Sequence, residues 1–301
     1  MLAGEHSQLV RQDGQGDHRS GTFAALGHDF DIHSPDPGLV RYLTRLLQPL
    51  AVAHPASKTY RITQEGGSFY VRYGEEASLV EVLSTPGALV SAFLSHVNEE
   101  VIKRTNDRVL IHAAGAERDG VGLVLPAVME AGKTTLVAGL IQRGFRYLTD
   151  EAVAIDPEDL ALHPFPKPLS VDPGSWDVLK DLRPNVTAEE EPYLTKQWQV
   201  VASEIHDDAL AGVTTPRLIV ASQYVEGAPT RLEPVSRGRT VMKLAESTFV
   251  SAMPKQQVLA TVAELARRCD CYLLTVGNLA AACGLITDLI DGMSGSARRN
   301  D

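Results

Sequence analysis

The chain has 301 residues, 44% of them hydrophobic and 22% charged, which is enough to bury one large core or two moderate ones without disulfides or metals. It carries 28 Lys and Arg against 38 Asp and Glu, and the net charge of −10 argues against nucleic-acid binding, which needs a basic face. No apolar run approaches the ~20 residues of a membrane span, and the polar N-terminal segment lacks a signal-peptide core. We therefore expect a cytoplasmic protein with no membrane or nucleic-acid partner.

The sequence of the first 107 residues predicts a polar tail followed by a small α+β region. Residues 1–20 are rich in Gly, Gln, Asp and Ser and are expected to be a disordered tail. The region 21–107 predicts, in chain order, a strand over 23–32, a helix that begins after Pro37, a hairpin that pairs 58–63 with 68–73, and a helix that begins at Thr85-Pro86. The second helix places Leu89, Phe93, Val97 and Val101 on one buried face.

From residue 108 the pattern changes to strand, loop, helix and strand, an order typical of an α/β nucleotide-binding domain. The domain is expected to span 108–292 and to be followed by a flexible tail over 293–301. Its expected strands lie at 109–116, 120–125, 145–156, 216–222, 230–235 and 271–276, and its helices at 136–143, 173–182, 237–246, 256–268 and 279–290. Because no polar, low-complexity linker precedes residue 108, the smaller N-terminal α+β region is expected to pack on this domain.

A phosphate-binding loop is predicted where the second of these strands meets the helix. The expected nucleotide-binding residues are Ala127, Val128, Met129, Glu130, Ala131, Gly132, Lys133, Thr134 and Thr135. Gly132 lets the backbone approach the phosphates, and Lys133 supplies a positive charge to them. Thr134 offers a hydroxyl to Mg²⁺, so ATP and Mg²⁺ are the expected ligands. Ala127 replaces the first glycine of the pattern, and Glu130 adds a negative charge, so a degenerate nucleotide site stays open as an alternative.

Two acidic residues and a histidine are the candidates for chemistry around this loop. Asp150 and Glu151 end the strand that follows the loop helix, where the γ-phosphate of a bound nucleotide is expected. One carboxylate can hold Mg²⁺ opposite Thr134, and the other can accept a proton from an attacking hydroxyl. Glu151 is taken as the metal-side acid, although the residues leave the assignment open. His112 lies in an apolar strand, where it is either a core histidine or part of the site.

The segment LIHAAGAERDGVGLVLPAVMEAGKTTLVAGLIQRGFRYLTDE resembles the catalytic core of bacterial HPr kinase/phosphorylase, and especially the looser group of HPr-kinase-related proteins. The residues that match the family pattern are His112, Lys133, Thr134, Gly144, Asp150 and Glu151. The resemblance implies a P-loop kinase core of HPr-kinase type. It also implies transfer of phosphate from ATP to a serine-like hydroxyl, with His112, Lys133, Asp150 and Glu151 in the catalytic site.

The resemblance does not identify the acceptor, which is a hydroxyl of a peptide, a protein or a small molecule. The second acid is Glu where the family has Asp, and the loop has Ala127 and Glu130 where the family prefers Gly. These departures leave one alternative open, a nucleotide-binding regulatory or accessory protein with a degenerate, weakly active kinase site. Assembly into a homo-oligomer is also left open.

Overall fold

The computed structural model describes residues 11–12, 16–126, 132–250 and 252–297. The chain forms two compact units, the first made of residues 1–104, 170–174 and 182–201, and the second of residues 105–169, 175–181 and 202–301. The described residues form six α-helices and several sheets, which confirms the expected α/β class. None of these helices is both long enough and apolar enough to span a bilayer.

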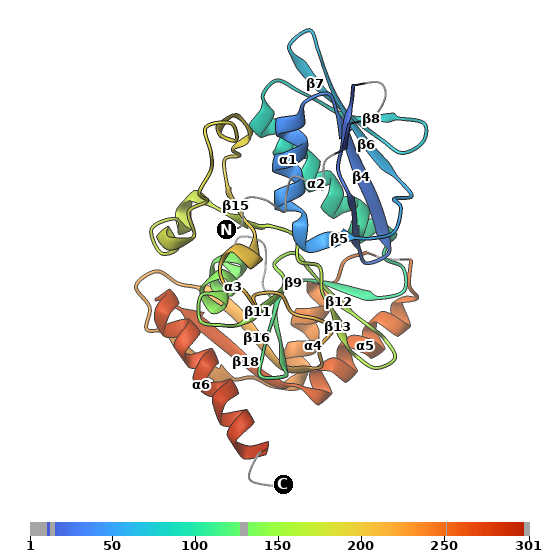
Figure 1. Ribbon diagram of the computed structural model, residues 1–301. Helices are drawn as coiled ribbons and strands as arrows, with labels where there is room; N and C mark the ends of the chain where they lie inside the picture. Colours follow the sequence, from blue (N-terminus) through green and yellow to red (C-terminus); the bar gives the residue numbers. More distant parts are fainter. Residues whose placement is uncertain (1–10, 13–15, 127–131, 251, 298–301) are drawn as a thin grey trace. The chain divides into compact units, whose positions relative to one another are not determined.

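The first unit is built on one sheet. Its strands are β1 (Arg11–Gln12), β2 (His18–Arg19), β3 (Thr22–Ala25), β4 (His28–Ser34), β5 (Ala51–Val52), β6 (Thr59–Glu65), β7 (Ser68–Tyr73) and β8 (Ser78–Leu83). The main path runs β1-β2-β4-β6-β7-β8, and β3 pairs with both β4 and β5. Strands β4 and β6 are parallel and the other pairs are antiparallel. Helices α1 (Pro37–Leu46) and α2 (Pro86–Arg104) pack on this sheet (Figure 1).

Local sequence explains where these elements begin and turn. Asp36 caps α1 by accepting hydrogen bonds from the amides of the next turn, and Thr85 caps α2 through the amide of Ala88 at 3.2 Å. Gly66 and Gly67 both have positive φ, +57° and +84°, and form the turn between β6 and β7. The two expected helices and the expected hairpin of this region are therefore confirmed.

The first unit differs from expectation at β5 and β8, which were not expected as strands, and in two further places. His18 and Arg19, expected in a disordered tail, form β2 because β4 offers them an edge to pair with. The single strand expected over 23–32 is two strands, β3 and β4. Leu26 and Gly27 separate them at φ of +48° and +86°, a turn that antiparallel pairing imposes and that apolar alternation does not reveal.

The second unit contains the larger mixed sheet. Its strands are β9 (Val109–Arg118), β10 (Val121–Pro126), β11 (Arg146–Thr149), β12 (Ala152–Ile155), β13 (Leu162–His163), β16 (Pro216–Tyr224), β17 (Arg231–Pro234) and β18 (Asp270–Val276). The order is β13-β12-β9-β10-β16-β18-β17, with β11 also paired to β9. Strands β10, β16 and β18 are parallel to one another, and the remaining pairs are antiparallel.

Four helices cover this sheet. They are α3 (Lys133–Ile141), α4 (Arg237–Glu246), α5 (Lys255–Arg268) and α6 (Leu279–Ala297). Helix α3 packs against α6 and α4 against α5, and Figure 1 shows the two pairs on opposite sides of the sheet. Two further short strands, β14 (Leu169–Val171) and β15 (Trp198–Val200), pair with each other, and apart from Leu169 they belong to the first unit.

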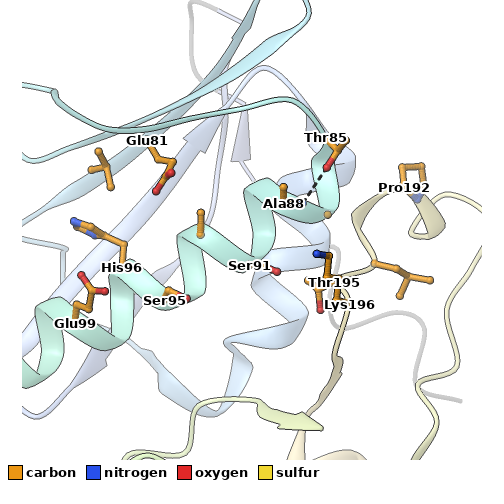
Figure 2. A pocket seen from close by; sticks show the side chains of 14 residues that line it. Glu81, Thr85, Ala88, Ser91, Ser95, His96, Glu99, Pro192, Thr195 and Lys196 are labelled. Atoms are coloured by element: carbon orange, nitrogen blue, oxygen red, sulfur yellow. Dashed lines mark hydrogen bonds between the residues drawn. The ribbon is translucent and has the colours of Figure 1, made fainter. Parts of the chain in front are cut away.

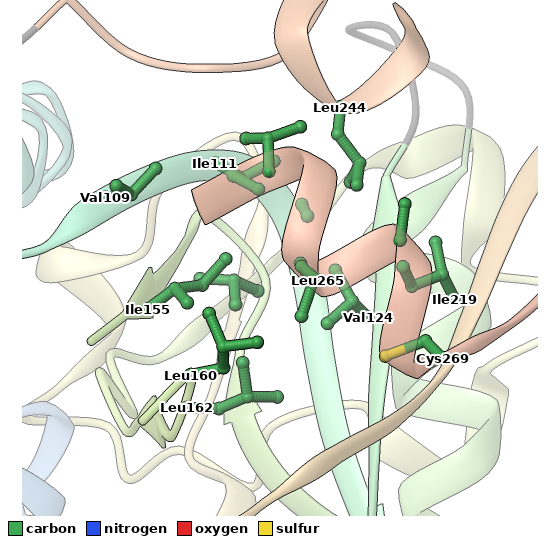
Figure 3. Close-up of a cluster of buried hydrophobic side chains, with 14 of the residues drawn as sticks. Val109, Ile111, Val124, Ile155, Leu160, Leu162, Ile219, Leu244, Leu265 and Cys269 are labelled. Carbon is green, nitrogen blue, oxygen red and sulfur yellow. The ribbon is translucent and has the colours of Figure 1, made fainter. Parts of the chain in front are cut away.

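The core of the second unit lies between the sheet and helices α4 and α5. Alternate residues of β9, Val109 and Ile111 among them, point into this cluster with Leu244 and Leu265 from the two helices (Figure 3). Since side chains of a strand alternate between its two faces, His112 lies on the opposite face of β9. Helix α3 packs on β9 as well, so the alternation places His112 on the side of α3.

The second unit also corrects three expectations. The strand expected over 145–156 is interrupted at Asp150-Glu151, which lie outside both β11 and β12. The register on β9 is the same on either side of them, since Thr149 pairs with Gly115 and Ala152 with His112, and the register shift lies earlier, between Tyr147 and Thr149. The helix expected over 173–182 is two single turns, η3 (Pro173–Ser175) and η4 (Lys180–Leu182), and the chain passes between the two units twice within this stretch. Helix α6 continues to Ala297, inside the segment expected to be a flexible tail.

Candidate functional site

Helix α3 begins where the phosphate-binding loop was predicted. The predicted loop residues Ala127, Val128, Met129, Glu130 and Ala131 lie outside the described residues. Gly132 is left-handed, at φ +79°, and its carbonyl accepts the amide of Leu136 at 2.9 Å, which closes the first turn of α3. The chain therefore enters this helix through the one residue type that takes such a conformation without strain. The free amides of a helix N-terminus favour an anion there.

Lys133 is the first residue of α3 and is buried, with 7% of its surface exposed. Burial lowers the pKa of its ammonium group, while the negative charges of Glu151 and Asp150 act in the opposite direction. The lysine that the sequence assigned to the phosphates therefore lies within electrostatic reach of both predicted acids. A buried ammonium ion is stabilised by further negative charge, such as that of a phosphate.

Asp150 connects the start of α3 to the break between β11 and β12. Its Oδ2 accepts the Thr134 hydroxyl at 3.0 Å, and its Oδ1 accepts the Tyr147 hydroxyl at 2.8 Å. The Nζ of Lys167 lies 2.7 Å from the same Oδ1, and the Asp150 side chain is only 2% exposed. Both carboxylate oxygens are therefore engaged by donors inside the protein.

Glu151 lies in a different environment from its neighbour. Its side chain is 33% exposed, and its Oε1 lies 3.6 Å from His112 Nδ1. The same ring nitrogen lies 3.1 Å from the backbone carbonyl of Glu151. Because a carbonyl oxygen can only accept, Nδ1 of His112 carries the proton in this contact. The two predicted acids are thus adjacent in sequence but differ in exposure and in partners.

His112 is held in the sheet on both sides. On one side, Ala152 of β12 pairs with His112. On the other side, the His112 amide donates to the carbonyl of Ser247 at 2.7 Å. The ring of Phe249 lies edge-on at 5.6 Å. Burial, followed by the positive charge of Lys133, lowers the pKa of His112, so the imidazole is neutral at pH 7. A neutral ring with its proton on Nδ1 leaves Nε2 as an acceptor.

The structure thus brings Lys133, Thr134, Asp150, Glu151 and His112 together. Thr135 instead makes a 2.5 Å hydroxyl contact with Ser175. The residues around the site that sequence reasoning missed are Tyr147, Lys167, Ser175 and Phe249. A signal existed only for Lys167, a charged residue between two prolines in an otherwise apolar segment, HPFPKP.

The donor set at Thr134 and Asp150 suits Mg²⁺. Among the described residues, no group of three or more His, Cys, Asp or Glu side chains is arranged to hold a metal. Mg²⁺ does not need such a group, because it is commonly held by one or two carboxylates together with phosphate oxygens and water. A hydroxyl and a carboxylate at the N-terminus of a helix fit that requirement.

The three cysteines, Cys269, Cys271 and Cys283, are buried and form no disulfide.

A cavity of about 760 Å³ lies in the first unit, between β8, α2 and residues 192–196 (Figure 2). Small or hydroxylated side chains of α2, such as Ala88, Ser91 and Ser95, form one wall, with Glu81 and Glu99 nearby. None of the predicted site residues lines it, because all of them belong to the second unit. The cavity is therefore a separate feature from the residues around Asp150.

No family model and no curated protein sequence matches this chain. Among solved structures, it is similar to the Hpr(Ser) kinase/phosphatase from Coxiella burnetii. The similarity covers 63% of this chain and 98% of that chain, with 14% sequence identity and a TM-score of 0.33. A similarity of this size does not carry the neighbour's activity over to this chain, so a function has to be argued from the residues themselves.

Proposed function

We propose that this protein is an ATP-dependent phosphotransferase that moves the γ-phosphate of ATP to a hydroxyl group of a peptide, protein or small-molecule acceptor. One observation carries the proposal: Thr134 Oγ1 and Asp150 Oδ2 lie 3.0 Å apart, at the start of the helix that begins with Lys133. A lysine, a hydroxyl and a carboxylate at a helix N-terminus are the parts that a Mg²⁺-bound nucleotide needs. The sequence resemblance over 109–156 supports the same reaction.

The binding half of the proposal assigns one role to each residue. Lys133 contacts the β- and γ-phosphates, and Gly132 leaves space for them to approach the backbone. Thr134 and Asp150 hold Mg²⁺, which when bound neutralises charge on the phosphoryl oxygens. Most of the rate acceleration then comes from holding acceptor and phosphate in line.

The catalytic half assigns the general base to Glu151 rather than to Asp150. Both oxygens of Asp150 already accept hydrogen bonds inside the protein, and its side chain is buried. Glu151 is partly exposed, so we assign it the contact with the acceptor hydroxyl. His112 donates to the carbonyl of Glu151 from Nδ1, so it fixes the backbone from which the Glu151 side chain projects.

Nucleotide binding tests the proposal directly. Wild-type protein is expected to bind Mg·ATP in calorimetry and to melt at a higher temperature with it, because a ligand that binds only the folded state stabilises that state by mass action. The substitution Lys133→Ala is expected to remove most of that gain. The exposed Lys255, at the start of α5, gives a matched control, Lys255→Ala, which should bind like wild type. If the wild type binds no nucleotide, the proposal is wrong.

The nucleotide-binding alternative from the sequence makes a different prediction. A regulatory or accessory protein would bind Mg·ATP but would not consume it in the presence of any acceptor. Turnover can be followed as ADP release with and without pooled hydroxyl-bearing acceptors, including serine-containing peptides. Binding in calorimetry together with no acceptor-dependent ADP release would favour the alternative over phosphotransfer.

A further inference from the structure

A buried lysine lies next to the proposed site and has no role in it so far. The Nζ of Lys167 is 2.7 Å from Asp150 Oδ1, and the two side chains are 5% and 2% exposed. Taking two such charges out of water is costly, and an apolar pair of similar volume is often at least as stable. The ion pair is therefore poorly explained as a device that only stabilises the core.

The contacts of Asp150 divide by oxygen. Its Oδ1 receives both the Tyr147 hydroxyl, at 2.8 Å, and the Lys167 ammonium group. Its Oδ2 receives the Thr134 hydroxyl at 3.0 Å. With one oxygen held by two donors, the carboxylate plane is fixed and the second oxygen stays directed at Thr134. When the Thr134 hydroxyl donates its hydrogen to Asp150, the lone pairs of the Thr134 oxygen point away from the carboxylate and are available to a cation.

Lys167 is itself held in place from several sides. Its Nζ donates to the carbonyl of Pro168 at 3.1 Å, and its amide donates to the carbonyl of Phe165 at 2.9 Å. The buried Phe165 in turn donates from its amide to the carbonyl of Leu148 in β11, at 2.9 Å. Prolines on either side of Lys167 restrict its backbone. The segment thus presents the ammonium group to Asp150 from a rigid support.

We propose that Lys167 and Tyr147 are positioning residues that, by fixing the Asp150 carboxylate, orient the Thr134 hydroxyl toward the Mg²⁺ of a bound nucleotide. This inference rests on the proposed function, because it concerns the same site. Residues that hydrogen-bond to metal ligands and orient them typically weaken metal binding by roughly 10–100-fold when they are removed. The Mg²⁺ dependence of nucleotide binding is therefore the quantity that Lys167 controls.

The experiment measures by calorimetry how much Mg²⁺ strengthens ATP binding, as the ratio of the ATP dissociation constant in EDTA to that in saturating Mg²⁺. In Lys167→Met this ratio is expected to fall by roughly tenfold, while ATP binding in EDTA changes little. Thr134→Val is expected to lower the ratio in the same way. The double variant should lose no more than either single one, since both changes act on one hydroxyl.

Two further variants make the result decisive. The exposed lysine variant Lys255→Met is the control and should keep the wild-type ratio. Tyr147→Phe removes one donor to Oδ1 at almost the same volume, so if circular dichroism shows that Lys167→Met does not fold, a lowered ratio in Tyr147→Phe supports the inference. If Lys167→Met or Tyr147→Phe folds and keeps the wild-type ratio, the inference is wrong. It is also wrong if ATP affinity falls equally with and without Mg²⁺, or if the effects in the double variant are additive, because these results are expected of a residue that only stabilises the fold.

The inference and the proposed function fail in different ways. A wild-type protein that binds ATP more tightly with Mg²⁺, together with folded Lys167 and Tyr147 variants that keep this gain, overturns the role of Lys167 alone. A wild-type protein that binds no nucleotide in either condition overturns both.

Discussion

Two adjacent carboxylates, Asp150 and Glu151, differ in burial and in the groups they contact. Asp150 is buried, accepts hydrogen bonds from the hydroxyls of Thr134 and Tyr147 and forms an ion pair with Lys167, whereas Glu151 is a third exposed and lies beside His112. Both residues lie in the gap between β11, which ends at Thr149, and β12, which begins at Ala152. Neighbouring acids can therefore divide metal binding and proton transfer between them.

This division predicts opposite phenotypes for two isosteric substitutions. Glu151→Gln removes the proposed base, and general-base catalysis contributes typically 10²–10⁴-fold, so transfer should fall by about that factor while Mg·ATP affinity stays near wild type. Asp150→Asn should instead weaken the Mg²⁺-dependent part of ATP binding. Single-turnover transfer rates and calorimetry on both variants separate the two roles. Transfer that survives in Glu151→Gln but is abolished in Asp150→Asn with binding intact would reverse the assignment.

His28, in the first unit, gives a second prediction at the scale of a residue. It is buried and stacks on Phe30 at 5.4 Å. Burial lowers its pKa to about 4, helped by the charges of Arg104 and His96 and opposed by those of Glu100 and Asp29. Between pH 6.5 and about 4 the unfolded chain therefore binds more protons at this residue than the folded one. The contribution of His28 to stability is present above pH 6.5 and is lost as the pH falls through that window.

Urea unfolding at pH 7 and pH 5 checks this dependence. His28→Gln removes the titrating group, so its urea midpoint should fall less between the two pH values than that of wild type. His54→Gln, at an exposed histidine, is the matched control and should keep the wild-type pH dependence. Equal pH dependence in wild type and His28→Gln would show that another group dominates.

At the scale of elements, two glycines show how closely the segment around η5 (Glu191–Tyr193) lies against the starts of α1 and α2. A Cβ at Gly87, in the first turn of α2, would lie 2.2 Å from the backbone carbonyl oxygen of Leu194. A Cβ at Gly38, in the first turn of α1, would lie 2.8 Å from the hydroxyl of Tyr193. The first obstacle is backbone and cannot move cheaply, whereas the second is the end of a side chain.

Gly87→Ala should therefore destabilise the protein although alanine is the better helix former. The propensity gain of up to about 1 kcal/mol is outweighed by overpacking, which typically costs about 1–3 kcal/mol. Gly38→Ala should cost less, and Gly174→Ala, where a Cβ meets open space, should be close to neutral. Thermal unfolding of the three variants gives the order. A stabilised Gly87→Ala would mean that Leu194 is not in contact with α2.

The same elements indicate how far the sequence alone reaches. The starts of α1 and α2 were predictable, because a cap residue and a proline act within one turn. The helix after the phosphate-loop motif was expected over 136–143, whereas α3 covers Lys133–Ile141. The hairpin at Gly66-Gly67 had turn residues that allow positive φ. The residues of β9 that pair with β11 and β12 were not predictable, because this register depends on segments far apart in the chain.

The site shows the same limit. Lys133, Thr134, Asp150, Glu151 and His112 could be selected from the sequence because a motif or a strand position marked each of them. Their mutual distances, and the different surroundings of the two acids, depend on contacts between segments far apart in the chain. Lys167 is the clearest case: its local sequence indicates only a stiff loop, and its ion pair with Asp150 exists only after the sheet has formed.

At the scale of the whole molecule, the units do not follow a single boundary in the chain. Residues 170–174 and 182–201 belong to the first unit, although the sequence placed them in the domain spanning 108–292. Within the first unit, the Tyr193 hydroxyl donates to Asp36 Oδ2 at 2.6 Å, and its ring stacks on Tyr42 at 5.5 Å. Arg45 Nε lies 3.0 Å from Glu190. A cut near residue 105 would therefore leave residues 1–104 without part of their own unit.

This composition predicts that residues 1–104 expressed alone are less stable than the same residues in the full chain. The cap residue of α1, Asp36, would lose its tyrosine donor, and the starts of α1 and α2 would lose the segment packed against them. A synthetic peptide of residues 182–201, added in excess, should bind the fragment and raise its unfolding midpoint, because it binds only the folded form. The same peptide with Tyr193→Ala is the control and should bind more weakly, since it lacks both the hydrogen bond and the ring contact. Urea unfolding, monitored by circular dichroism, is measured for the fragment alone, with the peptide and with the Tyr193→Ala peptide. A fragment whose midpoint is high alone and unchanged by the peptide would show that residues 1–104 complete the unit by themselves.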